Sequence, residues 1–423
     1  MSANITDVLV IGGGPGGTTA GTFLRQRGYS VTLLEKDSHP RFHIGESLLP
    51  MNLPILERMG VLEQVKAIGV TKYGADFTET SSGAECRTFR FGEALGNSPD
   101  HAFEVRRSDF DRVLFEHCRA RGVDAIEGMR VVSAEILDNG HHRVTALDAD
   151  NVEHNWEARF LVDASGRDTF LSSARKWKKR NPRHASAAVF AHFRGVQRRP
   201  GSDQGNISLY WFNHGWIWLI PLEDDVMSIG AVCKPEFLKS RKEPLEEFLL
   251  QTLNSVPEVR ERMGSAEQLL PVQATGNYSY LSRRLHGPGF VMVGDAYAFI
   301  DPVFSSGVYL AMNSAEMACH PIDAWLAGDR LAYRRRMRRY ERRINRGISS
   351  FSWFIYRFTT PGMRLLMSQP KNVLKVVQAV ISMLAGDVFD NREVRRRLWV
   401  FKSFYSVATF VAWTRRHRGS AAG

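Results

Sequence analysis

A glycine-rich turn near the N-terminus, Gly12-Gly13-Gly14-Pro15-Gly16-Gly17, carries the first residues whose spacing could support chemistry. Gly12, Gly14 and Gly17 fit the pattern G-x-G-x-x-G. In that pattern the first glycine permits a tight turn, the second lets a pyrophosphate approach the backbone, and the third lets a helix pack closely. The turn therefore predicts a bound dinucleotide whose phosphates face the free N–H groups of the next helix.

The elements around this turn must hold it in place. Residues 6–11 form a β-branched apolar run that predicts a buried parallel strand, and a helix is expected from about Thr18 to Arg27. A second strand over residues 30–34 ends at Glu35. There the carboxylate can accept hydrogen bonds from both ribose hydroxyls and would repel a 2′-phosphate, which excludes NADP.

Two later strand ends indicate FAD rather than NAD. Phe160–Arg167 and Phe290–Ala296 are apolar runs that stop in small-residue turns, and Asp295 is placed to bond the ribityl hydroxyls of a flavin. With Glu104–Asp111, these segments resemble the FAD-binding set of the aromatic-hydroxylase superfamily, which includes geranylgeranyl reductases and flavin-dependent halogenases. The resemblance places Arg107 near the flavin phosphates or ring. Because the chain has no second G-x-G-x-x-G for a nicotinamide, reduced FAD is expected from a separate flavin reductase.

The string Trp216-Ile217-Trp218-Leu219-Ile220-Pro221 selects within that superfamily, because it resembles the signature of flavin-dependent halogenases. Residues 207–212 look like its hairpin partner, so Trp216 and Trp218 share one face of a strand that Pro221 ends. In that family the tryptophans wall the flavin chamber and transfer no proton. Arg41–Pro50 resembles the loop beneath the flavin ring, which makes Arg41, Ile44 and Ser47 expected cofactor contacts.

Two more segments match the same family. Thr71–Phe77 resembles its lysine segment, with Lys72 just before Gly-Ala-x-Phe. Asp301–Val308 resembles the loop in which the backbone amides of Ser306 and Gly307 would hold chloride or bromide, and backbone N–H groups at a helix start suit an anion.

The resemblance implies a halogenating oxidoreductase in which reduced FAD, O₂ and halide give hypohalous acid. Lys72 would meet that acid either as an ammonium that hydrogen-bonds to it or as an amine that forms a haloamine. Burial favours the amine by lowering the lysine pKa, and the sequence leaves both routes open.

Phe304 departs from the pattern of halogenases that act on free tryptophan, which carry a glutamate there. Those enzymes are also longer. The chain therefore resembles the subgroup that halogenates pyrroles or phenols, often tethered as thioesters to a carrier protein. Its substrate is expected to be such a ring on an acyl or peptidyl carrier protein, in secondary metabolite biosynthesis.

Composition limits the partners and the compartment. The 423 residues carry a formal net charge of +11, which favours an acidic partner or serves solubility alone. Four scattered cysteines without C-x-x-C spacing predict a reduced cytoplasmic protein with no metal. No apolar run reaches the roughly 18 residues of a membrane span, so the protein is expected to be soluble or at most peripheral. No nucleic-acid motif accompanies the arginines, and no such partner is expected.

The expected fold is α/β, a Rossmann-like FAD-binding domain interleaved with a mixed β-sheet substrate domain, followed by a helical C-terminal region. The predicted core is 1–323, with FAD-binding segments at about 1–70, 105–170 and 280–323, substrate-sheet segments at about 71–104 and 171–279, and a substrate-access region at 324–423. The charge run Arg334–Arg343 is either a solvated helix or a docking face. Residues 392–418 would cover the substrate chamber or rest on a membrane surface.

Two other functions are compatible with the sequence. One is an FAD monooxygenase or polyprenyl reductase of the same superfamily that does not halogenate. The other is a non-catalytic flavoprotein that binds an acidic partner through its basic face. Halide-dependent product mass distinguishes the first, and turnover of any kind distinguishes the second.

Overall fold

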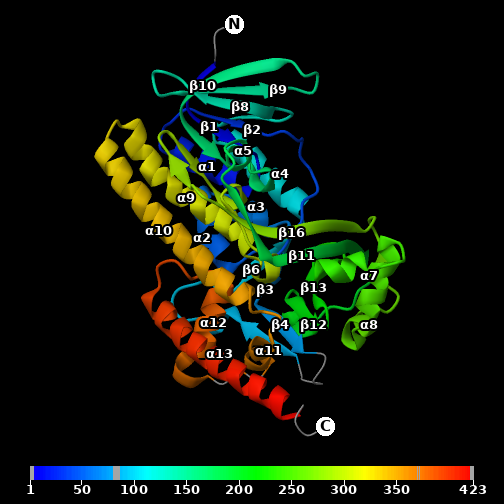
Figure 1. The fold of residues 1–423 in the computed structure, drawn as a ribbon. Coiled ribbons are helices and arrows are strands. Elements are labelled where there is room, and N and C mark those ends of the chain that lie inside the picture. The colour runs from blue at the N-terminus through cyan, green and yellow to red at the C-terminus, as the bar shows by residue number, and fades with distance from the viewer. Residues whose placement is uncertain (1–3, 80–85, 369, 371, 420–423) are drawn as a thin grey trace.

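The computed structural model describes residues 4–79, 86–368, 370 and 372–419, and Figure 1 shows their arrangement. Its first large sheet has the strand order β17-β18-β10-β1-β2-β7, in which β18, β10, β1, β2 and β7 run parallel. The strands of this sheet are β1 (Asn4–Ile11), β2 (Val31–Leu34), β7 (Asp124–Ile126), β8 (Arg130–Ile136), β9 (His142–Leu147), β10 (Glu153–Asp163), β17 (His286–Gly287) and β18 (Phe290–Met292). The predicted α/β class is confirmed.

Three long helices pack beside this sheet, α1 (Pro15–Gln26), α4 (Arg107–Ala120) and α9 (Ser306–Leu326). Helix α1 begins three residues before the predicted start, because Pro15 occupies its first turn, where a fixed φ and a missing N–H cost nothing. The shorter helices of this half are α2 (Leu53–Met59), α3 (Leu62–Lys66) and α5 (Phe170–Ala174).

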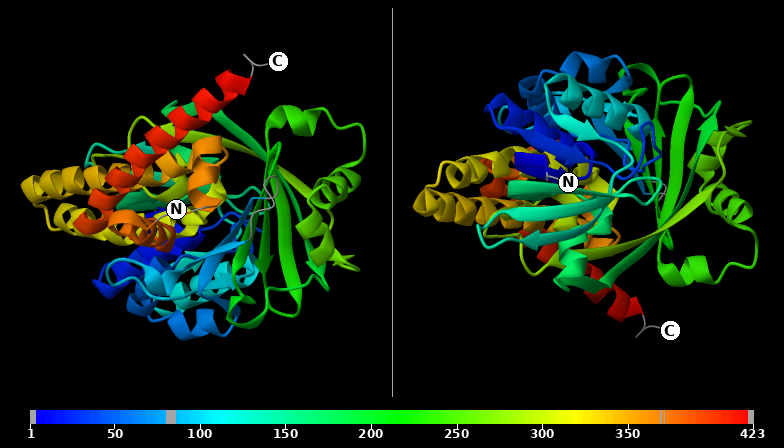
Figure 2. Two further views of the ribbon diagram at one scale, coloured as in Figure 1. Left: turned by 90° about the horizontal axis from the view of Figure 1, so that it is seen from below. Right: turned by 90° about the horizontal axis from the view of Figure 1, so that it is seen from above.

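The second large sheet has the order β19-β16-β11-β14-β13-β12-β4-β5, with β15 paired to β11. Its strands are β4 (Gly74–Glu79), β5 (Arg87–Arg90), β11 (Lys178–Arg194), β12 (Ile207–Phe212), β13 (Gly215–Pro221), β14 (Val226–Cys233), β15 (Glu267–Gln268), β16 (Gln273–Ser282) and β19 (Ala298–Phe299). Both views in Figure 2 show α7 (Leu245–Asn254) and α8 (Pro257–Met263) on its outer face; α6 is Pro235–Lys239.

Strand β13 divides its side chains between two cores. Ile217 and Leu219 belong to the core under α7 and α8, whereas Trp216, Trp218 and Ile220 belong to the main core of the molecule. The alternation follows from the two-residue period of a strand. The predicted hairpin is confirmed, since β12 and β13 are antiparallel partners, and Pro221 is the last residue of β13.

A small antiparallel ladder, separate from both large sheets, carries Lys72. It pairs β3 (Gly69–Lys72) with β6 (Ala102–Val105). The loop over residues 46–48 continues it, because Ser47 bridges Glu104 and the backbone N–H groups of Val105 and Leu48 bond across to that loop and strand.

The C-terminal helices are α10 (Arg330–Ile355), α11 (Pro361–Ser368), α12 (Val376–Ala385) and α13 (Arg392–Gly419). Helix α10 packs along α9, while α11 and α12 pack on α13 at the bottom of Figure 1. In the part of the chain that the structure describes, no helix is long and apolar enough to cross a membrane. The predicted boundaries of the domains stay a prediction.

Candidate functional site

A cavity of about 980 Å³ is lined by residues of both large sheets. Its volume lies at the upper end of the range for small-molecule sites, about 300–1,000 Å³. The predicted contacts that line it are Gly12, Gly14, Glu35, Arg41, Ile44, Ser47, Arg107, Asp295, Gly307, Trp216 and Trp218. Residues from distant parts of the sequence therefore meet around one space.

The glycine turn forms one end of this cavity. Gly12 has φ +103°, and a Cβ there would lie 2.5 Å from the carbonyl oxygen of Ala164. A Cβ on Gly17 would lie 1.8 Å from the carbonyl oxygen of Gly12, so only glycine lets α1 approach the turn. Gly17 does not line the cavity; it acts through this packing.

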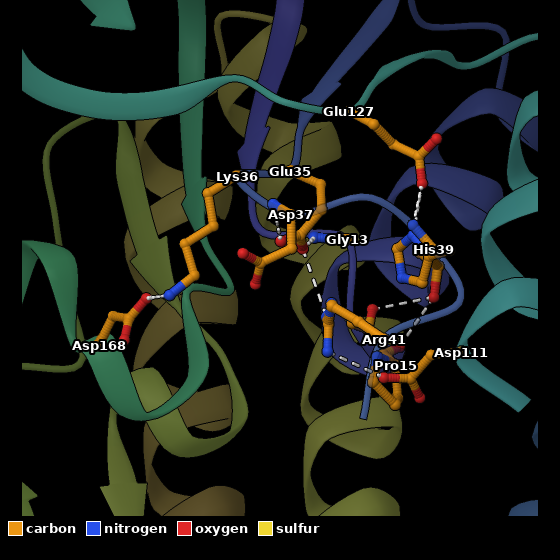
Figure 3. Close-up of polar contacts among 12 residues, drawn as sticks. Gly13, Pro15, Glu35, Lys36, Asp37, His39, Arg41, Asp111, Glu127 and Asp168 are labelled. Carbon is orange, nitrogen blue, oxygen red and sulfur yellow. Dashed lines mark hydrogen bonds and ion pairs between the residues drawn. The ribbon is translucent and has the colours of Figure 1, made fainter. Parts of the chain in front are cut away.

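Glu35 and Arg41 lie beside the turn, as Figure 3 shows. The Glu35 carboxylate accepts hydrogen bonds from the backbone N–H groups of Gly13 at 2.6 Å and Asp37 at 3.0 Å. Arg41 points between two acids, 3.4 Å from Glu35 and 3.4 Å from Asp111. Glu35 thus fixes the loop and faces the cavity at the same time.

Arg107 begins α4 and is held on three sides. Its Nε and Nη2 donate to the two oxygens of Asp111 at 2.9 and 3.0 Å, and its Nη1 donates to the carbonyl oxygen of Ile44 at 3.1 Å. A doubly bonded guanidinium keeps its orientation and suits phosphate or carbonyl oxygens. Together with burial, this charge lowers the pKa of His43 to about 4, so that imidazole in the cavity wall is neutral.

Asp295 stands at the far strand end, as predicted, and faces the cavity. Burial raises the pKa of its carboxyl to about 6, while Arg167 and Arg107 act in the opposite direction. The related turn after β10 is built by Asp163, which accepts hydrogen bonds from Ser165 and from the N–H of Leu171. Two acids at adjacent strand ends thus shape this wall.

The loop before α9 has an unusual backbone. Ser305 adopts φ +54°, in the left-handed region, and directly precedes the first turn of α9. The first N–H groups of a helix have no partner within the helix, so those of Ser306 and Gly307 are available to an anion. Ser305 and Gly307 line the cavity, whereas the Ser306 side chain is buried and does not.

The two signature tryptophans form another part of the cavity wall. Trp216 and Trp218 are 4% and 5% exposed, with ring centroids 5.9 Å apart. The indole Nε1 of Trp218 donates to Ser228 Oγ at 3.3 Å. Gly230 lies opposite Trp218 on β14, where a Cβ would come within 2.4 Å of the indole ring. These contacts fix the orientation of the tryptophans, whose indole Nε1–H groups donate hydrogen bonds but do not titrate.

Lys72 lies directly behind the cavity wall. It is 1% exposed, and its Nζ donates to the hydroxyl of Ser47, which itself lines the cavity, at 2.5 Å. Nζ also lies 3.3 Å from Glu104 Oε1. Burial lowers the pKa of the Lys72 ammonium, against the attraction of Glu104.

Glu104 and a second acid complete this group. Burial raises the pKa of the Glu104 carboxyl to about 7, although Lys72 and Ser47 act in the opposite direction. Glu46 precedes Ser47, is 1% exposed and lies 3.0 Å from His192 Nε2. This side of the candidate site therefore holds a lysine, two carboxylates and a histidine in the interior.

An aromatic cluster fills the space next to the tryptophan wall. Phe358, between α10 and α11, is 1% exposed and packs on four rings: Phe77, Trp211, Trp216 and Phe304. The indole of Trp211 donates to its carbonyl oxygen at 3.2 Å. The C-terminal region thus reaches the site through Phe358.

The sequence reasoning missed Glu104, Glu46, His192 and Phe358. Glu104 belongs to the segment Glu104–Asp111, whose resemblance concerns Arg107, and no local pattern places it against Lys72. The missing information was the register of β3 against β6, in which Val70 faces Glu104 and Lys72 faces Ala102. Lys36 was missed for a similar reason; it donates to Asp168 at 2.7 Å across the cavity margin (Figure 3).

The donor set fits FAD. A glycine turn at a helix start, a strand-end acid on each side and two fixed arginines offer partners for pyrophosphate, ribose and ribityl groups. The tryptophans and the apolar residues Ile44 and Ala188 supply flat apolar surface for a ring system.

A family model described as tryptophan halogenase matches residues 7–100 and 96–362. A chlorinase of pyrrole-2-carbonyl on a peptidyl-carrier protein, from Pseudomonas fluorescens, is 30% identical, covering 93% of this chain and 92% of its own. Among solved structures, a flavoprotein/dehydrogenase from Cytophaga hutchinsonii superposes with TM-score 0.89 at 28% identity, over 97% of this chain and 100% of its own. The flavin-dependent brominase Bmp2 superposes with TM-score 0.83 at 28% identity, over 95% and 99%.

Proposed function

Since this chain belongs to the tryptophan halogenase family of flavin-dependent halogenases, we propose that it halogenates an electron-rich pyrrole or phenol tethered to an acidic carrier protein. A relative that matches almost the whole chain acts on a pyrrole group bound to a peptidyl-carrier protein. Phe304 also supports such a ring, because the activated pyrrole or phenol needs less help than tryptophan, for which the family uses a carboxylate at that position.

The basic face of α10 supports the acidic partner. Its exposed arginines recur at helical spacing along one side: Arg334, Arg335, Arg338, Arg339, Arg342 and Arg346. Such a stripe raises the association rate with an oppositely charged protein and makes binding sensitive to salt. The end of α10 leads to Phe358, which touches the tryptophan wall, so the stripe is continuous with an element of the site.

The residues that line the cofactor cavity support the first part of the proposed reaction. Bound reduced FAD, with O₂ and halide, supplies hypohalous acid. Glu35, Arg41, Ile44, Ser47, Arg107 and Asp295 hold and orient the cofactor, and a separate flavin reductase provides its reduced form. The N–H groups of Ser306 and Gly307 hold chloride or bromide at the start of α9.

The observation that carries the proposal is the position of Lys72. Its Nζ is one serine hydroxyl away from the cofactor cavity and is shielded from water. A reactive halogen species that leaves the cavity meets Ser47 and then Lys72. The Trp216 and Trp218 wall keeps organic substrate out of the cofactor side, so the lysine is where acid and ring can meet.

The direct test is Lys72→Ala, with halogenated product followed by mass and flavin oxidation followed by absorbance. Halogenation should fall by at least about 100-fold, the usual share of a positioned proton-transfer group, while flavin oxidation continues. Lys66→Ala is the matched control, because that lysine is 63% exposed on α3. Retained halogenation in Lys72→Ala would refute the role of the lysine.

The substrate class is tested with pyrrolyl and hydroxyphenyl thioesters on carrier protein beside the free acids. Faster turnover of a tethered ring supports the proposal, and equal turnover of the free acid contradicts the tether. Oxygenated product that forms equally without chloride and bromide would contradict halogenation.

All four cysteines are free thiols, which supports the cytoplasm as the compartment.

A further inference from the structure

Glu104 is the carboxylate that touches the proposed catalytic lysine. Lys72 and Glu104 lie on neighbouring antiparallel strands, two residues apart in register, so their side chains emerge on the same face of the β3–β6 ladder. The backbone of Ser47 forms an antiparallel β-bridge with the backbone of Glu104. Glu104 is 0% exposed, and its Oε1 lies 3.3 Å from Lys72 Nζ.

Glu104 differs from the other buried acids near the cavity. Asp111 is bonded twice by Arg107, Glu46 pairs with His192, and Asp163 accepts backbone N–H groups. Glu104 has no guanidinium or imidazole partner within the described part of the chain, and the polar groups that act on its carboxylate are the Ser47 hydroxyl and the Lys72 ammonium. Keeping a carboxylate charged costs free energy when the side chain is shielded from water and has so few hydrogen-bond partners. A glutamate with a purely structural role in an ion pair would have more hydrogen-bond donors around it.

One carboxylate that halogenases of free tryptophan carry in the halide loop is replaced in this chain. At the position where halogenases of free tryptophan carry a glutamate, the halide loop has Phe304, which packs into the aromatic cluster against Phe358, and the Asp301 carboxylate of that loop accepts a hydrogen bond from Ser186. The acid next to the lysine comes instead from β6, an element far from that loop in the sequence.

We propose that Glu104 is a positioning residue that holds Lys72 as an ammonium, so that the lysine meets hypohalous acid as a proton donor and afterwards accepts the ring proton. This inference rests on the proposed function of Lys72. It selects the ammonium route over a haloamine on the lysine.

In this step Lys72 alone both donates a proton and accepts one. The ring carbon attacks the halogen, the carbon–halogen bond forms as the oxygen–halogen bond breaks, and the bonding pair goes to oxygen. That oxygen takes a proton from the Lys72 ammonium and leaves as water. The Lys72 amine then accepts the proton of the halogenated ring carbon, which restores the aromatic ring and the ammonium.

The surrounding charges set the pH range of this state. The groups that face Glu104 are Lys72 on β3 and, on the loop over residues 46–48, Ser47 and Glu46, the latter paired with His192 on β11. Burial raises the pKa of Glu104 to about 7, so the carboxylate and its ion pair with Lys72 are complete above that pH and are lost below it. Burial alone lowers the pKa of Lys72, and Glu104 opposes this.

The test is the pH profile of halogenation by Glu104→Gln in the full-length FAD-loaded enzyme. Glutamine keeps the shape but not the charge, so Lys72 should lose its proton and kcat should fall by about 100-fold at pH 8, with KM little changed. The acid limb near pH 7 should disappear. Glu104→Asp, which keeps a carboxylate, should recover part of kcat and keep an acid limb.

Glu79→Gln is the matched control, since Glu79, at the end of β4, is also a buried glutamate and pairs with Arg364 of α11. Bound-flavin absorbance shows whether each variant is folded, and Glu104→Asp keeps the test valid if Glu104→Gln fails to fold. A wild-type rate and acid limb in Glu104→Gln would overturn the inference, and so would faster turnover below pH 7, the mark of a lysine that reacts as the amine. Inactive Lys72→Ala with fully active Glu104→Gln would refute only this inference, whereas active Lys72→Ala refutes the proposed function.

Discussion

Replacing Gly307 by alanine separates the halide site from the stability of the fold. Gly307 lies in the first turn of α9 with ordinary helical backbone, and an added Cβ meets no atom within 4 Å. The new methyl group would point into open space at the cavity wall. It should therefore obstruct the proposed anion position without disturbing the protein packing.

The expected stability change is small and favourable. A glycine-to-alanine change at a compatible backbone position gains about 0.4–1 kcal/mol. With about 2.1 cal/mol/K per residue, the unfolding entropy of a chain of this length is about 0.9 kcal/mol/K, so Tm should rise by about 1 °C or less. The opposite sign is expected for Gly17→Ala, because its Cβ would lie 1.8 Å from the carbonyl oxygen of Gly12.

The functional change should be larger. A methyl group that removes one well-aligned N–H contact to the anion, worth about 1.5–3 kcal/mol when the partner is charged, raises the halide KM by about 10- to 100-fold. The assay measures halogenated product against bromide and chloride concentration, beside flavin oxidation and a thermal melt. An unchanged halide KM with an unchanged Tm would refute the assignment of the halide to this turn.

Two further predictions concern the C-terminal region. Phe358→Ala should destabilise the protein by about 3–5 kcal/mol, measured by denaturant unfolding, because its ring is fully buried among four aromatic rings; Phe358→Leu should cost clearly less, and equal costs would contradict the packing argument. The double change Arg338→Glu with Arg339→Glu should lower kcat/KM for a carrier-tethered substrate by about 10-fold or more at low salt and leave a free surrogate unaffected; an equal loss for both substrates would exclude α10 as the docking face.

The cofactor half of the site was readable in the sequence because its signals are local. The glycine turn works through backbone conformation at Gly12 and through close packing at Gly17, and both requirements act on neighbouring residues. Strand ends such as Glu35 and Asp295 were identifiable because the carboxyl ends of parallel strands meet at one edge of a sheet. The tryptophan alternation also held, since a strand has a fixed two-residue period.

The partners of these residues could not be read in the same way. Glu35 was expected to face the ribose, and the structure shows that its oxygens also tie down Gly13 and Asp37. For the C-terminal region the sequence predicted helices but not the residues that they contact. Only the tertiary structure shows that Phe358 packs against Trp216.

By itself, the sequence determined the fold class and the family, and it predicted the cofactor turn and the role of Lys72, because each depends on short spacings and local backbone demands. The tertiary structure alone decided that Lys72 lies one serine from the cavity and that Glu104 is its counter-charge. Both facts depend on the register between strands about 30 residues apart and on complete exclusion of water. Register and burial are properties of the packed molecule, and they convert an ordinary lysine and glutamate into a coupled pair.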